Sequence, residues 1–140
     1  MLPTLTLRQL NTAGQTQQGL VDDVSTRSLL TVRVGEGAGK LSTGLANAFV
    51  GYEAGKIHNQ GSYVTFIGYQ AGEQNANASY GTFVGAYAGR QNQRGNENVF
   101  VGYRTGERNI SGSDCVAVGA YAMRDNASGN FSVAIGYSAG

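Results

Sequence analysis

The sequence predicts an all-β fold, a parallel β-roll or β-solenoid built from 17-residue coils. The first observation is one short phrase that recurs at a constant 17-residue spacing over most of the 140-residue chain. The second is that each copy contains a short run of strand-forming residues, such as Phe-Val or Phe-Ile. The third is that glycines bound this run on both sides, as turn residues bound a strand. A helix-pair repeat is excluded because it needs about 30 residues or more.

The repeated phrase consists of an apolar pair, a glycine, usually a tyrosine, then a small residue and a second glycine. Residues 47–63 have the sequence "NAFVGYEAGKIHNQGSY" and residues 64–80 the sequence "VTFIGYQAGEQNANASY". The central glycines are Gly51, Gly68, Gly85, Gly102, Gly119 and Gly136. A degenerate copy, "VRVGEGAGK", is centred on Gly35, one residue short of the period. We therefore expect about seven coils over residues 31–140, a rod roughly 30 Å long if stacked strands lie about 4.8 Å apart.

The composition excludes several classes of protein. Ten basic and nine acidic residues are dispersed along the chain and give a net charge of +1, so no basic tract indicates nucleic acid as a partner. Cys115 is the single cysteine, which rules out an intrachain disulfide and a cysteine-based zinc cage. Collagen is excluded because glycine does not recur at every third residue and there is only one proline.

The apolar pair predicts two columns of side chains on opposite faces of the stacked strands, because neighbouring residues in a strand point in opposite directions. The candidate core or interface residues are Phe49, Phe66, Phe83 and Phe100, followed in the chain by Val50, Ile67, Val84 and Val101. We favour an interior of Val or Ile with small alanines, and phenylalanines outside; the opposite assignment is nearly as good. With either assignment, one of the two apolar columns faces outward and would be exposed to water on a monomer. We therefore expect a homo-oligomer, with a trimer about a long axis as the favoured form.

A charged column follows each central glycine by five residues, and its signs alternate. We call it the charge ladder; it consists of Lys56, Glu73, Arg90, Glu107 and Arg124. If the coils stack in register, each neighbouring pair contributes about 0.2–1 kcal/mol. The alternative is that the alternation of charge signs is coincidental and that these side chains simply lie on a solvated face.

A tyrosine column follows the central glycine directly at Tyr52, Tyr69, Tyr103 and Tyr137. At Tyr87 and Tyr121 the tyrosine comes one place later, and strand alternation predicts that this shift moves the phenol to the other side. Surface tyrosines commonly contact sugars and proteins. The favoured alternative is that they cover the coil edge or a groove between subunits.

We expect no enzymatic activity, no catalytic residues, no cofactor and no metal. His58, the single histidine, occupies the column that holds asparagine in later coils, so we interpret it as a variant turn residue. A nucleophile needs a base and an orienting group, and Cys115 lies three to four coils from His58, on the order of 15 Å. Stacking could still pair carboxylates from different coils, so a β-helical polysaccharide depolymerase remains an alternative.

The motifs "NAFVGYEAG", "TFIGYQAG" and "NVFVGYRTG" resemble the Gly-Tyr repeats of bacteriophage tail fibres. "VAVGAYA" and "VAIGYSAG" are similar to the repeats in the heads of YadA-type trimeric autotransporters, a family that forms a left-handed parallel β-roll and a trimer. The resemblance covers about residues 31–140.

The resemblance implies a structural protein on the extracellular face of a virion, a tail fibre whose trimeric shaft projects toward the host. Residues 1–30 would attach to tail or baseplate proteins, or alternatively cap the first coil. The host surface receptor would be contacted by a distal part outside this chain. The alternative from the second resemblance is the head of a bacterial trimeric adhesin.

Overall fold

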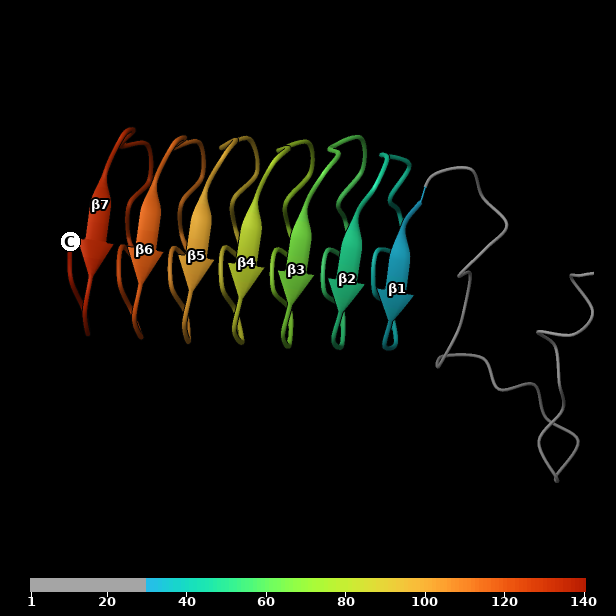
Figure 1. Cartoon of the computed structure of the whole chain (residues 1–140), viewed down its shortest axis with the longest axis horizontal. Helices are drawn as coiled ribbons and strands as arrows, with labels where there is room; N and C mark the ends of the chain where they lie inside the picture. Colours follow the sequence, from blue (N-terminus) through green and yellow to red (C-terminus); the bar gives the residue numbers. More distant parts are fainter. Residues whose placement is uncertain (1–29) are drawn as a thin grey trace, which may run out of the picture.

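A computed structural model of the chain describes residues 30–140, which form one β-solenoid (Figure 1). Its seven strands of three residues pair in parallel, in chain order, into a single sheet. The strands are β1 (Val32–Val34), β2 (Ala48–Val50), β3 (Thr65–Ile67), β4 (Thr82–Val84), β5 (Val99–Val101), β6 (Val116–Val118) and β7 (Val133–Ile135). The predicted all-β parallel solenoid of 17-residue coils is therefore confirmed. The predicted attachment or capping segment, residues 1–30, lies outside the described residues except for Leu30.

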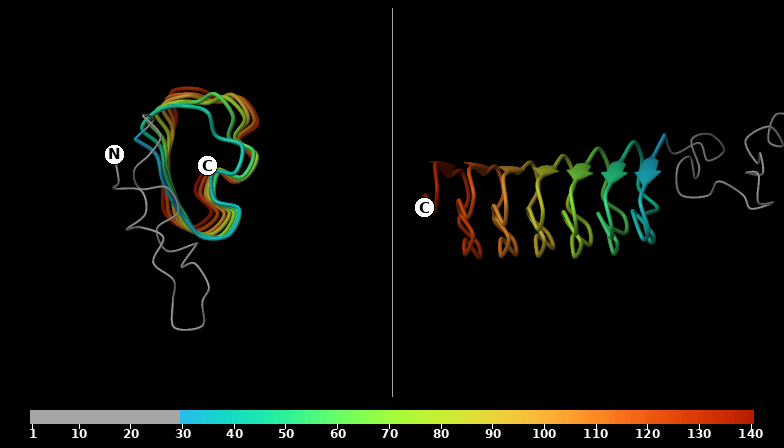
Figure 2. Two further views of the ribbon diagram at one scale, coloured as in Figure 1. Left: turned by 90° about the vertical axis from the view of Figure 1, so that its right-hand side faces the viewer. Right: turned by 90° about the horizontal axis from the view of Figure 1, so that it is seen from below.

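The strands stack in the register that the repeat predicts. Phe49 lies opposite Phe66, and Val50 lies opposite Ile67, each one repeat period further along the chain. The degenerate first coil is one residue short, yet Val34 still pairs with Val50, so the missing residue does not disturb the register. Viewed along the rod, successive coils superimpose, with the strands forming one wall (Figure 2).

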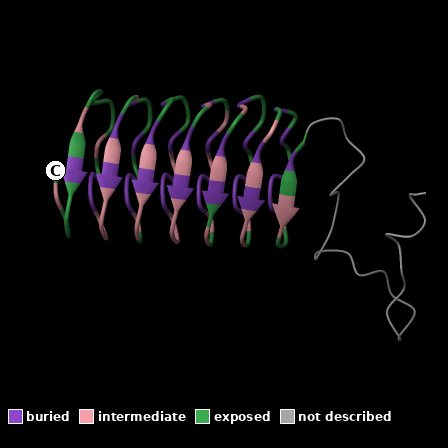
Figure 3. Ribbon diagram, viewed as in Figure 1, coloured by how far each residue is buried: buried purple, intermediate pink, exposed green. Residues whose placement is uncertain are grey.

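The phenylalanine column fills the interior. Phe49, Phe66, Phe83 and Phe100 have no exposed surface. Their rings contact one another along the rod, with centroids 4.6 Å apart between Phe66 and Phe83 and 5.1 Å apart between Phe83 and Phe100. The favoured prediction of a Val or Ile interior is therefore wrong, and the interior is the one given by the opposite assignment. In Figure 3 the buried middle residue of most strands is flanked by partly exposed neighbours.

Glycines opposite the strand make the interior wide enough for these rings. A Cβ atom on Gly89 would lie 2.5 Å from the Phe83 ring, and one on Gly106 would lie 2.6 Å from the Phe100 ring. Both distances are too short for a side chain, so the ring occupies the space that any other residue would need. The sequence signal was the second glycine of the phrase, which the strand pattern alone identifies only as a turn.

Asparagine side chains form a second, polar part of the interior. The Asn109 amide donates to Asn92 Oδ1 at 2.7 Å, and the Asn126 amide donates to Asn109 Oδ1 at 3.0 Å. The amides of Asn92 and Asn109 also donate to the carbonyl of the glycine three residues later, each at 2.7 Å. His58 takes the same place, with Nε2 2.8 Å from the Gly61 carbonyl oxygen. Its interpretation as a variant of the asparagine turn residue is confirmed.

Candidate assembly surface

The outward side of the sheet is an apolar surface that runs the length of the described rod. In each strand the first and third residues point away from the interior, because side chains alternate along a strand. We call these residues the assembly face: Val32, Val34, Ala48, Val50, Thr65, Ile67, Thr82, Val84, Val99, Val101, Val116, Val118, Val133 and Ile135. None of them is charged, and most are β-branched.

Of the two predicted interface columns, only the Val and Ile column reaches the surface. Val50, Val84 and Val101 are partly exposed, and Ile67 is 40% exposed. The phenylalanines cannot contact another chain because they are enclosed. The first residue of each strand also faces outward, because it lies two places before the Val or Ile column; these residues were not among the predicted interface residues.

The described residues provide no cover for this surface. Parallel sheets are normally covered on both faces, because their strands are apolar on both sides. Here the coil covers one face, and the described chain has no further layer over the other (Figures 1 and 2). A long apolar surface of this kind is typical of a site where another protein surface packs.

The tyrosines form one continuous stripe along the border where the strands end. We call Tyr52, Tyr69, Tyr87, Tyr103, Tyr121 and Tyr137 the tyrosine stripe. Each ring contacts the next, with centroids 5.3 to 6.1 Å apart. The predicted move of Tyr87 and Tyr121 to the other side is wrong. These two residues have left-handed φ angles of 60° and 62°, so strand alternation no longer applies in the turn.

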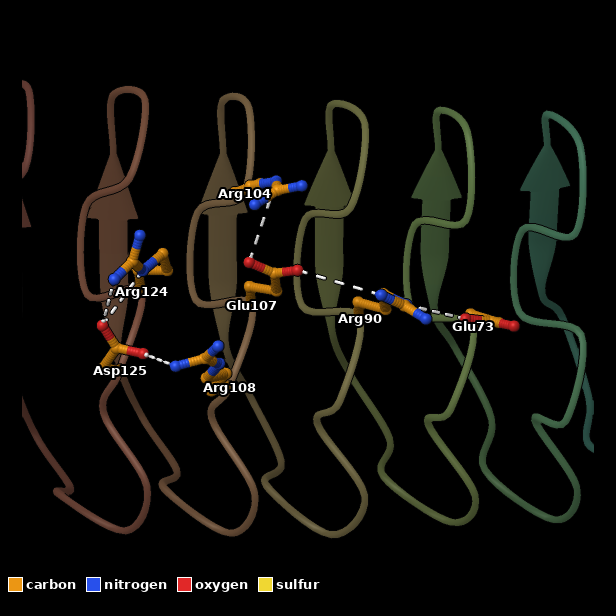
Figure 4. Close-up of polar contacts among 7 residues, drawn as sticks. All are labelled: Glu73, Arg90, Arg104, Glu107, Arg108, Arg124 and Asp125. Atoms are coloured by element: carbon orange, nitrogen blue, oxygen red, sulfur yellow. Dashed lines mark hydrogen bonds and ion pairs between the residues drawn. The ribbon is translucent and has the colours of Figure 1, made fainter.

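The middle of the charge ladder forms as predicted, with contacts between successive coils. Arg90 Nε lies 2.8 Å from Glu73 Oε2, and Arg90 Nη1 lies 4.0 Å from Glu107 Oε1, between successive coils (Figure 4). Hydrogen bonding to Glu73 raises the pKa of Arg90 above its ordinary value.

The two ends of the charge ladder take partners from their own coils. Lys56 Nζ lies 2.6 Å from Glu53 Oε1, and Arg124 Nη2 lies 2.9 Å from Asp125 Oδ2. These carboxylates are close in the chain, so the side chains reach them without spanning the gap between coils. The hydrogen bond from Lys56 lowers the pKa of Glu53, and that from Arg124 lowers the pKa of Asp125. Both carboxylates are therefore held in the ionised form, which suits structural ion pairs rather than proton transfer.

The remaining chemical candidates are enclosed and lie apart. Cys115 is buried, with Sγ 3.1 Å from the Gly129 carbonyl oxygen. His58 is buried between the Phe49 and Phe66 rings, and burial lowers its pKa below the ordinary value of 6.5. Among residues 30–140, no three His, Cys, Asp or Glu side chains lie together as a metal site would need. The main candidate functional feature of the described residues is therefore the assembly face.

Comparison of the chain with protein-family models, with curated proteins and with solved structures finds no match. No helix in the described part of the chain is long and apolar enough to span a membrane.

Proposed function

We propose that this chain is a structural protein of a bacteriophage virion, the shaft of a tail fibre that assembles as a homotrimer through the assembly face. The observation that carries the proposal is the uncharged, β-branched outer surface that extends over all seven strands. Three such surfaces turned toward a common axis would bury one another and form a second apolar core. The repeat motifs that resemble tail-fibre repeats supply the biological setting.

The backbone supports a mechanical role. Hydrogen bonds join neighbouring coils on several sides of the cross-section, not only within the sheet. Examples are Gly55 N to the Ala71 carbonyl at 2.9 Å, Asn59 N to the Ala76 carbonyl at 2.7 Å, and Tyr80 N to the Ser62 carbonyl at 3.0 Å. Bending the rod would have to break such bonds on one side, so the solenoid suits a stiff spacer.

The proposed setting has three parts. Residues 1–30 attach to tail or baseplate proteins, the trimeric shaft projects from the particle, and the distal end of the fibre contacts the host surface receptor. The chain would thus act in adsorption by holding the receptor-binding part away from the particle. No nucleic acid, cofactor or catalytic step enters this proposal.

A bacterial trimeric adhesin head is the second candidate. The observation that favours it is the tyrosine stripe, in which Tyr52, Tyr69 and Tyr103 are each between 41% and 45% exposed. Half-exposed tyrosines along a rigid rod could bind a ligand directly. The depolymerase alternative is less well supported, because Glu73 and Glu107 have Arg90 between them rather than a substrate-sized gap.

The mass of the native protein in solution tests the assembly. We expect three chains, and we expect Val84→Asp with Val101→Asp to yield monomers, because charge would be placed inside the trimer core. Arg94→Glu, an exposed substitution outside the face, is the matched control and should remain trimeric. A wild-type monomer at micromolar concentration would refute the proposed assembly. Antibodies against the purified chain should label phage tails; labelling of bacterial surfaces instead would favour the adhesin.

A further inference from the structure

The two long borders of the assembly face carry different chemistry. One border is the tyrosine stripe, which follows the strands. The other is a corner column of one residue per coil, which precedes the strands. We call Tyr63, Tyr80, Glu97, Asp114 and Phe131 the corner column. All five side chains are exposed, and all five residues have φ angles between 53° and 59°, which turn the chain sharply into the strand.

The corner column bears two acidic residues without a partner in the described chain. Glu97 and Asp114 occupy successive coils, and no cation of residues 30–140 lies within ion-pair distance of either carboxylate. Neighbouring like charges on stacked coils are destabilising by themselves. A cation between them would remove this cost.

The opposite border bears an arginine whose side chain is poorly satisfied. The Arg104 side chain is 38% exposed, its Nε has no hydrogen-bond partner, and the nearest carboxylate oxygen, from Glu107, is 4.0 Å away. Arg90 and Arg124, by contrast, have carboxylate oxygens at 2.8 and 2.9 Å. The Arg104 guanidinium lies over the rings of Tyr87 and Tyr103, at 5.2 and 5.3 Å from their centroids, so the stripe holds it at this border.

Arg104 lies at a level of the rod between the two acidic residues. Arg104 follows Glu97 by seven places and precedes Asp114 by ten, which together make one coil. Since one coil rises about 4.8 Å, each acidic residue lies within about 3 Å of Arg104 along the rod axis. In the same way, Tyr63 falls at a level between Tyr52 and Tyr69. The borders therefore match level by level, aromatic with aromatic and acid with base.

We infer that the copies associate in parallel and in register, with the Arg104 border of one chain docked on the Glu97–Asp114 corner of the next copy. Rotation about an axis along the rod brings opposite borders of two copies together at one level. An antiparallel twofold would instead place identical borders together and leave Glu97 and Asp114 without Arg104. This inference rests on the proposed assembly through the assembly face, and it identifies the residues that set its direction.

Charge exchange tests the contact. Arg104→Glu places a third acid beside Glu97 and Asp114, so the concentration at which the trimer dissociates should rise at least about tenfold. Adding Glu97→Arg and Asp114→Arg to the same chain should restore wild-type assembly. Arg94→Glu is the control, since Arg94 is exposed and has no ion pair among the described residues. Analytical ultracentrifugation gives the masses, and circular dichroism shows that each variant is folded.

Disulfide trapping tests the direction. In a Cys115→Val chain, Glu97→Cys combined with Tyr103→Cys should yield covalent trimers under oxidation, whereas either cysteine alone should not cross-link. Covalent dimers from Glu97→Cys alone would show antiparallel packing and overturn the inference. Trimers that neither cross-link in the double variant nor respond to charge exchange would also overturn it, and would leave the assembly intact. A wild-type monomer would overturn both.

Discussion

The coils of β2–β5 and the coil of β6 fill the same interior in two different ways. In the first group a phenylalanine from the strand meets a glycine on the opposite wall, as Phe100 meets Gly106. In the β6 coil the strand residue is Ala117, and the glycine position is held by Met123. Met123 is only 5% exposed and belongs to the buried apolar cluster that includes Ala117, so its side chain packs in the interior that phenylalanine rings occupy in the other coils.

This difference teaches that two columns of the repeat, far apart around the coil, share one volume. Met123 even adopts the left-handed conformation of the glycines it replaces, with φ of 48°, compared with 58° at Gly106. The backbone of the turn is therefore set by the solenoid rather than by glycine. The glycine is needed because of the ring, and where the ring is absent a side chain is accepted.

The largest effect should come from emptying the interior of a phenylalanine coil. Phe83→Ala removes a fully enclosed ring that contacts rings on both sides, and should reduce the free energy of unfolding by about 3–5 kcal/mol. Urea unfolding followed by circular dichroism measures this. Gln93→Ala, at an exposed position outside the assembly face and its two borders, is the control and should cost less than about 1 kcal/mol. Equal losses from both variants would contradict the assigned interior.

A transplant of the β6 arrangement into the β5 coil tests the shared volume directly. Gly106→Met alone should destabilise by about 2 kcal/mol or more, because the side chain overlaps the Phe100 ring and the residue has a positive φ. In a Phe100→Ala chain the same substitution should cost far less, with a coupling of about 1–3 kcal/mol. Strictly additive losses in this double-mutant cycle would show that the two columns do not share space.

His58 gives an intermediate effect that depends on pH. Burial lowers its pKa in the folded chain below 6.5, so the unfolded chain binds the proton more tightly. The stabilising contribution of neutral His58 is complete above about pH 6.5, the unfolded value, and is lost as the pH falls toward the folded pKa.

The measurement is the urea midpoint of the wild type and of His58→Asn between pH 7.5 and 5. The wild type should lose stability over this range, whereas the variant, which carries the residue found in later coils, should not. The ion-paired Glu53 and Asp125 add little pH dependence over this range, because their stabilising contributions are present above their unfolded pKa values of 4.5 and 3.8 and are lost only as the pH falls below those values. Parallel curves for the two proteins would exclude His58 as the cause.

The smallest effect should come from the charge ladder. Arg90→Ala removes the contact with Glu73 and should cost about 0.5–1 kcal/mol, because the pair is partly exposed and lies between coils. High salt should reduce the difference from the wild type. Arg124→Ala removes a more exposed pair within one coil, and its loss should be smaller still. A larger loss for Arg124→Ala in thermal unfolding would reverse this order.

Much of the fold could be predicted because the repeat is regular. The positions of the strands, their parallel order and the pairing of Phe49 with Phe66 follow from a constant repeat period without insertions. A column of serine and asparagine residues, each directly before a residue of the corner column, was not predicted although it recurs with the same period. Ser62 N donates to Ser79 Oγ at 3.0 Å, and Ser79 N donates to Asn96 Oδ1 at 2.8 Å, so these side chains join coils where the backbone turns. Each position of this column is either serine or asparagine, and the pattern is visible only once the register is known.

The sequence by itself determined that the chain coils with a fixed period, where each strand lies, and that one apolar column is enclosed while its neighbour faces outward. The tertiary structure decided which column is enclosed, because strand alternation defines two faces but not what lies opposite each. The glycines beside the phenylalanine rings resolve that choice. The tertiary structure also decided that Tyr87 and Tyr121 stay in the tyrosine stripe. In addition, it decided that Lys56 and Arg124 form ion pairs within their own coils rather than along the charge ladder. Those outcomes depend on turn conformation and on distances across the coil, which residue spacing along the chain does not contain.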